Sequence, residues 1–227
     1  MPGLTEAVRA AGFDLDGTLI DTAADLAAAA NSMLAQLGMP TLPEADIPPF
    51  IGAGIERLIL QALAASARRA PTPAEQTQGL ALFRAHYARQ LYARSRVYPG
   101  VEAGLRALAA AGMPLSCVTN KAAEFTGPLL DAAGLKPYFA LVLTPGCEAD
   151  RKPSPALLLA ACAQLHIAPR ELLYVGDSRA DIIAARAAGC RTVSVSYGYN
   201  SRDVLAQLNP DAIIASLADL SALQLPA

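Results

Sequence analysis

The chain has 227 residues, 17% of them charged, and a formal net charge of −2, so it lacks the basic field that nucleic-acid binding requires. Its 53% hydrophobic residues exclude a disordered chain, and its length suits one large domain or a core with a smaller insert. Neither a long uninterrupted apolar stretch nor a basic-then-apolar leader is present, so we expect a cytoplasmic protein with no membrane partner.

The first part of the chain predicts one strand followed by helices. The apolar run 8–15 has the length and composition of a buried strand, and it ends in a tight turn. We expect Asp21 or Thr22 to cap the alanine-rich helix that follows, with Asp25 at the capping-box distance from Thr22. Apolar residues then recur at helical spacing, which predicts an all-helical segment over residues 43–94.

From Tyr98 onward the pattern alternates between helices and short apolar strands. The predicted strands lie at residues 115–118, 139–143, 172–175, 192–195 and 212–214, and a terminal helix closes the chain. The strands show no apolar–polar alternation, which is typical of a sheet covered on both faces. Strands and helices in this order predict right-handed crossovers and a parallel sheet.

The predicted fold is therefore α/β, with a Rossmann-like parallel-sheet core that is interrupted by an inserted all-helical cap domain. We assign residues 1–20 and 95–227 to the core and residues 21–94 to the cap. The division follows from the change of pattern, because the helical segment begins directly after the first strand and ends where the alternation starts.

Polar residues follow four of the predicted strands, at the edge where open parallel sheets bind ligands. In chain order they are Asp14, Asp16 and Thr18 after the first strand, Thr119 and Asn120 after the second, Lys152 beyond the third, and Asp177 and Asp181 after the fourth. Each one alone is an ordinary turn or helix-entry residue. Together, acidic residues, a lysine and a hydroxyl at one sheet edge predict a single polar site.

This set of residues suits phosphoryl transfer. A carboxylate such as Asp14 can attack a phosphoryl group and form an aspartyl-phosphate. Because carboxylate and phosphate repel each other, a divalent cation must bridge them, and oxygen ligands from Asp14 and Asp177 select Mg²⁺. Lys152 can balance the remaining negative charge, and Thr119 can hold a phosphate oxygen. Asp16 can protonate the leaving alkoxide and later activate water.

The segments GFDLDGTLID, VTNK, RKP and GDSRADI, in this order, resemble the four signature motifs of the haloacid dehalogenase superfamily. The resemblance covers almost the whole chain and implies a helical cap inserted just after the first motif. It implies Asp14 as the nucleophile and Asp16 as the general acid and base. It also implies that Asp14, the Asp16 carbonyl and Asp177 bind Mg²⁺, with Asp181 supporting the metal-bound water or Lys152.

Within this superfamily, Asp16 favours phosphoryl transfer, because cleavage of a carbon–halogen bond leaves no alkoxide to protonate. A closer resemblance is to the bacterial phosphoglycolate phosphatases, and it includes the segments FIGAG, YPGV, SYGYN and PDAIIASLADL. This resemblance implies a small phosphorylated metabolite, 2-phosphoglycolate, as the substrate. The alternatives are a sugar phosphate as the substrate, a phosphomutase, or a non-catalytic regulator on the same scaffold. The oligomeric state stays open.

Substrate contacts are predicted for Thr18 and Asn120 in the core and for Arg57 in the cap. Gly52 and Gly54 can let the backbone approach a substrate. Arg57 follows them by about one helical turn and can bind a small carboxylate. The alternative is that the glycines only open a helix and that Arg57 is solvated.

Overall fold

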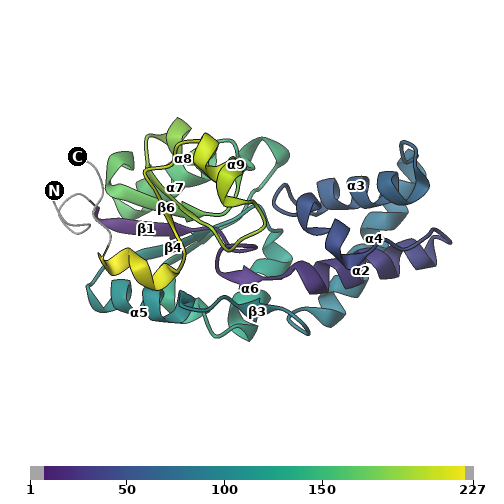
Figure 1. Cartoon of the computed structure of the whole chain (residues 1–227), viewed down its shortest axis with the longest axis horizontal. Coiled ribbons are helices and arrows are strands. Elements are labelled where there is room, and N and C mark those ends of the chain that lie inside the picture. The colour runs from purple at the N-terminus through teal and green to yellow at the C-terminus, as the bar shows by residue number, and fades with distance from the viewer. Residues whose placement is uncertain (1–7, 223–227) are drawn as a thin grey trace.

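A computed structural model describes residues 8–222 and contains a six-stranded, fully parallel sheet (Figure 1). The strand order is β5-β4-β1-β6-β7-β8, so the first strand of the chain lies inside the sheet. The strands are β1 (Ala10–Phe13), β4 (Leu115–Val118), β5 (Leu141–Leu143), β6 (Leu172–Gly176), β7 (Arg191–Val195) and β8 (Ala212–Ile214). Phe13 at the end of β1 pairs with Cys117 of β4 and with Val175 of β6, so the carboxyl ends of these three strands lie side by side.

Helices cover both faces of the sheet (Figure 1). They are α5 (Val101–Ala110) and α6 (Ala123–Ala132) on one face and α7 (Ala156–Leu165) and α8 (Arg179–Ala188) on the other, with α9 (Arg202–Gln207) between β7 and β8. Successive β1 side chains divide between two apolar clusters. Ala11 and Phe13 belong to the cluster that contains Leu105 of α5, whereas Ala10 belongs to the cluster that contains Leu158 of α7. This burial on both faces explains the continuous apolar strands.

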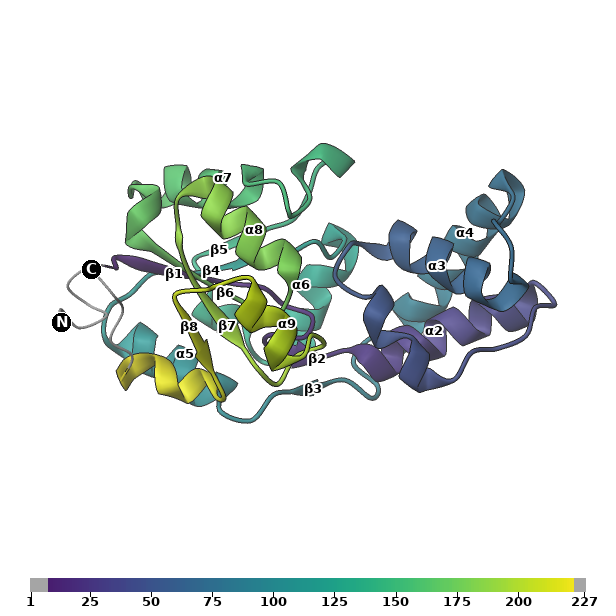
Figure 2. The ribbon, with the colours of Figure 1, turned by 45° about the horizontal axis from the view of Figure 1, so that its top comes forward.

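Three helices form a separate group beside the carboxyl ends of the strands (Figure 2). These cap helices are α2 (Ala23–Gln36), α3 (Ile55–Ala67) and α4 (Pro73–Gln90), and they pack around their own apolar cluster. The chain enters the group through β2 (Ile20–Asp21) and leaves it through β3 (Arg96–Val97), and these two strands pair antiparallel. The proposed domain boundaries, at 20/21 and 94/95, stay a prediction; the first lies within β2 and the second just before β3.

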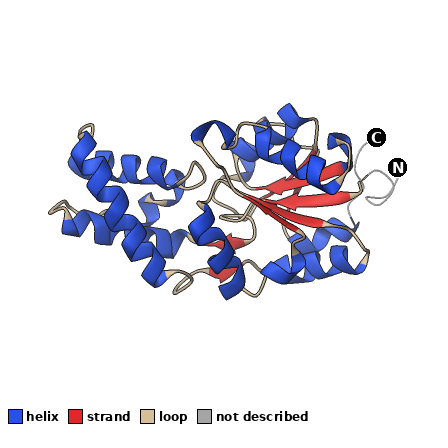
Figure 3. Ribbon diagram, turned by 180° about the vertical axis from the view of Figure 1, so that it is seen from behind, coloured by secondary structure: helices blue, strands red, loops and turns tan. Residues whose placement is uncertain are grey.

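The predicted α/β fold with a parallel, Rossmann-like core is confirmed (Figure 3). The structure shows which of the two candidate N-cap residues, Asp21 or Thr22, bonds to the first turn of α2. The carboxylate of Asp21 accepts a hydrogen bond from the N–H of Ala23 (3.2 Å). Thr22 occupies the N-cap position without a side-chain capping bond, and its hydroxyl donates to Asp16 (2.8 Å). Thr22 therefore contributes to the polar edge of the sheet rather than to the helix end.

The capping-box prediction for Asp25 is wrong. This buried carboxylate accepts hydrogen bonds from the N–H groups of Arg94 and Ser95 (both 2.8 Å), so it ties the first turn of α2 to the chain that returns from the cap. The short β2–β3 pair and the six-residue α9 were not predicted, because segments this short carry no periodicity. The terminal helix is a 3₁₀ helix at Leu217–Ala222, and its predicted continuation lies outside the described residues. Among residues 8–222, no helix is long and apolar enough to cross a membrane.

Candidate active site

Three neighbouring strand ends bring polar residues together at one edge of the sheet. Asp14 follows β1, Thr119 follows β4 and Asp177 follows β6, and all three side chains are buried. The chain turns sharply after β1, where the N–H of Gly17 donates to the carbonyl of Ile20 (2.9 Å). Gly17 has a φ of +84°, and a Cβ there would lie 2.5 Å from a carboxylate oxygen of Asp177. Only glycine allows this turn to lie against Asp177.

Lys152 is the cation at the centre of the acidic residues. Its Nζ lies 2.9 Å from Oδ1 of Asp14 and 2.7 Å from Oδ1 of Asp181. It also donates to the Tyr174 hydroxyl (2.7 Å) and the Val118 carbonyl (3.1 Å). Burial alone would lower the pKa of Lys152, but Asp14 and Asp181 raise it above its ordinary value, so the ammonium stays charged. Asp181 thus holds Lys152, which is one of the two supporting roles expected for it.

Asp177 is fixed by groups from two loops. Its Oδ2 accepts the N–H of Tyr199 (2.7 Å), and its Oδ1 accepts the hydroxyl of Thr18 (3.2 Å). Gly198 lies so close that an added Cβ would collide with the Asp177 side chain. The Thr18 side chain is completely buried against Asp177, so it supports a carboxylate and does not occupy the substrate-contacting position predicted for it.

The carboxylates of Asp14, Asp177 and Asp181 form a buried cluster in which one oxygen from each lies within 4.8 Å of the others. Among residues 8–222, the ion pairs of these three acids are those of Asp14 and Asp181 with Lys152, which leaves excess negative charge in a buried site. Burial raises the pKa of Asp14 to about 6. Burial, together with Asp181 and Asp14, raises the pKa of Asp177 well above its ordinary value. A divalent cation would relieve this excess, and an all-oxygen donor set suits a hard cation. The residues therefore fit a divalent metal site.

We expect Mg²⁺ to raise the melting temperature more at pH 7.5 than at pH 5.0. Because the pKa of Asp14 is raised to about 6, the folded protein without metal binds more protons than the unfolded chain between about pH 4 and 6, and its stability falls as the pH rises through that range. At pH 5.0 protons compete with the cation, whereas at pH 7.5 they do not. At 100 times its Kd, a ligand adds about 2.7 kcal/mol, or about 5–10 °C for a chain of this size.

Thermal melts with Mg²⁺ and with EDTA at both pH values measure this difference. Asp177→Asn should abolish the metal-dependent shift at pH 7.5. Asp131→Asn is the matched control, since Asp131 is an exposed carboxylate that pairs with Lys136 (2.7 Å), and it should keep the shift. An unchanged shift in Asp177→Asn would place the cation elsewhere.

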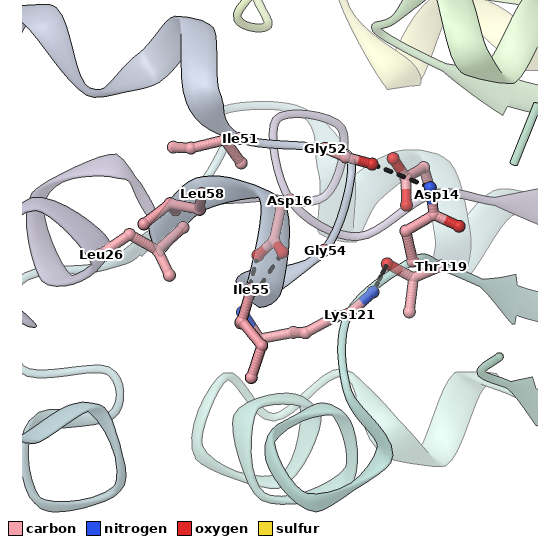
Figure 4. A pocket seen from close by; sticks show the side chains of 11 residues that line it. Asp14, Asp16, Leu26, Ile51, Gly52, Gly54, Ile55, Leu58, Thr119 and Lys121 are labelled. Atoms are coloured by element: carbon pink, nitrogen blue, oxygen red, sulfur yellow. Dashed lines mark hydrogen bonds and ion pairs between the residues drawn. The ribbon is translucent and has the colours of Figure 1, made fainter. Parts of the chain in front are cut away.

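Asp16 lies beside this cluster and has partners of its own (Figure 4). Its carboxylate accepts hydrogen bonds from the Thr22 hydroxyl (2.8 Å) and from Nζ of Lys121 (3.1 and 3.2 Å). The Lys121 side chain is only 2% exposed. Sequence reasoning missed Lys121 as a site residue. The available signal was that the chain has only three lysines, and that Lys121 and Lys152 both fall in the quoted motifs.

Thr119 and Asn120 follow β4 but have different surroundings. Thr119 lines the cavity beside Asp14, and its Oγ1 accepts the N–H of Lys121 (3.2 Å), so its hydroxyl hydrogen can be donated to a ligand (Figure 4). Asn120 donates to the carbonyls of Gly52 (2.8 Å) and Lys152 (2.9 Å) and accepts the N–H of Lys152 (2.8 Å). These bonds engage both ends of its amide. Asn120 therefore joins the cap loop to the Lys152 loop.

The cavity in front of these residues encloses about 380 Å³ when the open solvent at its mouth is included. Its polar wall comes from the core and consists of Asp14, Asp16, Thr119, Asn120 and Lys121. Its opposite wall comes from the cap and consists of Leu26, Ile51, Gly52, Gly54, Ile55 and Leu58 (Figure 4). The cap thus covers the polar wall of the cavity with apolar side chains and backbone.

Arg57 does not line this cavity. Ile55 and Leu58 line it from α3, whereas Arg57 is exposed. At 3.6 residues per turn, Arg57 points about 160° away from the direction of Ile55 and about 100° from that of Leu58. In this arrangement Arg57 is solvated, as in the alternative, and its contact with the substrate stays a prediction.

Ion pairs join the cap helices to the core around the cavity. Glu56 of α3 lies 2.6 Å from Arg151, the residue before Lys152, and Arg84 of α4 lies 3.2 Å from Glu124 of α6. Arg84 also lies 3.4 Å from Glu56, so the three ion pairs form one connected network between the cap and the core. Each pair is partly exposed and adds little alone. Together they hold the cap over the polar wall.

Comparisons with known proteins agree with this geometry. Residues 12–195 match the model of a family described as haloacid dehalogenase-like hydrolase. The phosphoglycolate phosphatase of Thiobacillus denitrificans is 44% identical over 212 residues, which are 93% of this chain and 93% of the relative. That of Nitrosospira multiformis is 45% identical over 216 residues, which are 95% of this chain and 95% of the relative. A crystal structure described as a predicted phosphoglycolate phosphatase, from Haemophilus somnus 129pt, superposes with a TM-score of 0.87 at 36% identity and covers 94% of this chain and 96% of that one.

Proposed function

Since this chain belongs to the haloacid dehalogenase-like hydrolase family, we propose that it hydrolyses a small phosphate monoester, and 2-phosphoglycolate in particular. The observation that carries the chemistry is the buried Asp14–Lys152 pair, with Asp14 and Asp16 side by side on the polar wall of one cavity. The substrate follows from relatives that carry the name phosphoglycolate phosphatase at 44–45% identity over more than nine-tenths of the chain.

Asp14 is the proposed nucleophile. The Leu15 N–H (2.7 Å) and the Lys152 ammonium (2.9 Å) both contact its Oδ1. Its Oδ2 receives no hydrogen bond from residues 8–222 and can attack phosphorus. A new bond then forms between Oδ2 and phosphorus while the ester oxygen–phosphorus bond breaks, which gives an aspartyl-phosphate.

Asp16 is the proposed general acid and base. In the first step it gives a proton to the leaving alkoxide, and in the second it takes a proton from the water that attacks the aspartyl-phosphate. Lys121 and Thr22 fix its carboxylate for both transfers. This division of roles suits an alkyl phosphate, whose leaving group is too basic to depart without a proton.

The remaining residues neutralise and position the phosphoryl group. Lys152 stabilises its negative charge, and the Thr119 hydroxyl donates to one of its oxygens. Asp14, Asp177 and the main-chain carbonyl of Asp16 are proposed to hold Mg²⁺, with Asp181 acting through Lys152. When bound, the cation neutralises charge between carboxylate and phosphate. Closure of the cap over a bound ester would exclude bulk water and strengthen each of these interactions.

A panel of phosphate esters tests the proposal. With Mg²⁺, kcat/KM for 2-phosphoglycolate should exceed that for a hexose 6-phosphate by about 100-fold or more, because the apolar cap residues that line the cavity leave little room and no polar partners for the larger ester. EDTA should remove the activity. A preference for the hexose phosphate would favour the sugar-phosphatase alternative. Transfer of phosphate between sugars without its release would indicate a mutase, and no turnover of any ester would contradict the phosphatase assignment.

A further inference from the structure

A tyrosine from the cap reaches the general acid through one intermediate residue. The hydroxyl of Tyr87, on α4, lies 2.7 Å from Nζ of Lys121, and the same ammonium contacts both carboxylate oxygens of Asp16 (3.1 and 3.2 Å). Tyr87 and Lys121 are both buried. Tyr87 does not line the cavity, so it has no direct access to a substrate in this arrangement.

The Tyr87 ring is held rigidly by aromatic neighbours. It stacks on Phe83 of the same helix, with ring centroids 5.7 Å apart, and it packs edge-to-face with Phe125, with ring centroids 4.9 Å apart. Phe125 belongs to α6 of the core, so this contact crosses from the cap to the core. Such packing leaves the hydroxyl little freedom, and its position is fixed relative to Lys121.

Each donor of the Lys121 ammonium has a hydrogen-bond acceptor. An ammonium has three donors, and among residues 8–222 the Lys121 Nζ has three hydrogen-bond acceptors, which are the Tyr87 hydroxyl and the two oxygens of Asp16. Without the Tyr87 hydroxyl, one donor of a buried ammonium would lack a partner. A flexible lysine then reorients to satisfy it, and the Asp16 carboxylate loses its fixed position.

We propose that Tyr87 is a positioning residue, which acts through Lys121 to orient Asp16 for proton transfer to the leaving group. The inference rests on the proposed function, because it assigns the proton transfer to Asp16. It predicts a loss that depends on how much the leaving group needs a proton. A merely structural role of Tyr87 would affect all esters alike.

Tyr87→Phe removes the hydroxyl and keeps the ring. We expect kcat/KM for 2-phosphoglycolate to fall about 10- to 30-fold, a fraction of the full effect of a general acid. For p-nitrophenyl phosphate, whose leaving group departs without a proton, the loss should stay below about 3-fold. Because kcat/KM covers only the steps up to departure of the leaving group, the later water step does not enter the comparison. Tyr138→Phe is the matched control on the core, and it should keep both values within about 2-fold of wild type.

A double-variant cycle tests the route through Lys121. If Tyr87 acts through the ammonium, adding Tyr87→Phe to Lys121→Gln should cost less than 2-fold beyond Lys121→Gln alone. Lys121→Gln by itself should show the same dependence on the leaving group, which keeps the inference testable even if Tyr87→Phe folds poorly.

Equal losses on both esters, in Tyr87→Phe or in Lys121→Gln, would overturn the inference, and so would losses that multiply in the double variant. Wild-type levels of activity in Tyr87→Phe would overturn it as well. These outcomes are distinct from failure of the proposed function, in which the wild-type protein itself would hydrolyse neither ester or would prefer a hexose phosphate to 2-phosphoglycolate.

Discussion

Asp14→Asn is expected to lower kcat by at least about 10⁴-fold while the protein stays folded. The amide has the shape of the carboxylate, but it cannot form the aspartyl-phosphate. The fold should tolerate the change, because burial raises the pKa of Asp14 and its charge is costly to the folded state. Lys152 keeps Asp181 as its partner at 2.7 Å. Steady-state kinetics on the best ester, together with a thermal melt, measure both parts of this expectation.

The control for this experiment is Asp46→Asn, which makes the same chemical change at an exposed position in a short 3₁₀ helix of the cap and should leave kcat unchanged. In the wild-type protein, a peptide containing residue 14 should carry a phosphoryl group after rapid acid quenching, and Asp14→Asn should lack it. If the variant kept a tenth of the wild-type kcat, the nucleophile would have to be another residue.

The residues that follow strands could be predicted because a parallel sheet leaves them little choice of position. Asp14, Thr119 and Asp177 each come directly after a strand, and β1 lies between β4 and β6, so their meeting follows from topology alone. Lys152 required the motif, because it comes from a loop well beyond β5. Its approach to Asp14 depends on tertiary contacts that spacing does not encode.

Where the structure differs from the sequence-based expectations, the difference concerns the direction of a side chain rather than its place in the chain. Thr18 lies in the expected turn, yet its hydroxyl is directed to Asp177. Arg57 lies on the expected helix, but the face carrying Ile55 and Leu58 is the one that packs over the cavity. Asp25 is in the expected helical turn, and the returning chain provides better donors than the helix end. Each outcome depends on a partner remote in sequence, which local patterns cannot show.

Lys152→Met should destabilise the protein at neutral pH and also lower its activity. The Lys152 side chain is 1% exposed, and its removal leaves the buried carboxylates of Asp14 and Asp181 without a cation. Breaking a buried ion pair from one side typically costs about 3–5 kcal/mol of unfolding free energy. The loss of a charge that stabilises the phosphoryl group should lower kcat by about 10²- to 10³-fold.

The pH dependence separates this electrostatic effect from simple loss of packing. Without the ammonium, the pKa of Asp14, already raised by burial, rises further. The folded variant therefore binds protons as the pH falls, and its loss of unfolding free energy relative to the wild type is smaller at pH 5.0 than at pH 7.5. Lys136→Met is the matched control, because Lys136 is half-exposed and pairs with Asp131 at the surface, where removal of a charge changes stability by about 0.5 kcal/mol or less. Denaturant unfolding of both variants at the two pH values measures the difference. A deficit for Lys152→Met that is the same at both pH values would mean that lost packing, and not the unpaired carboxylates, destabilises the variant.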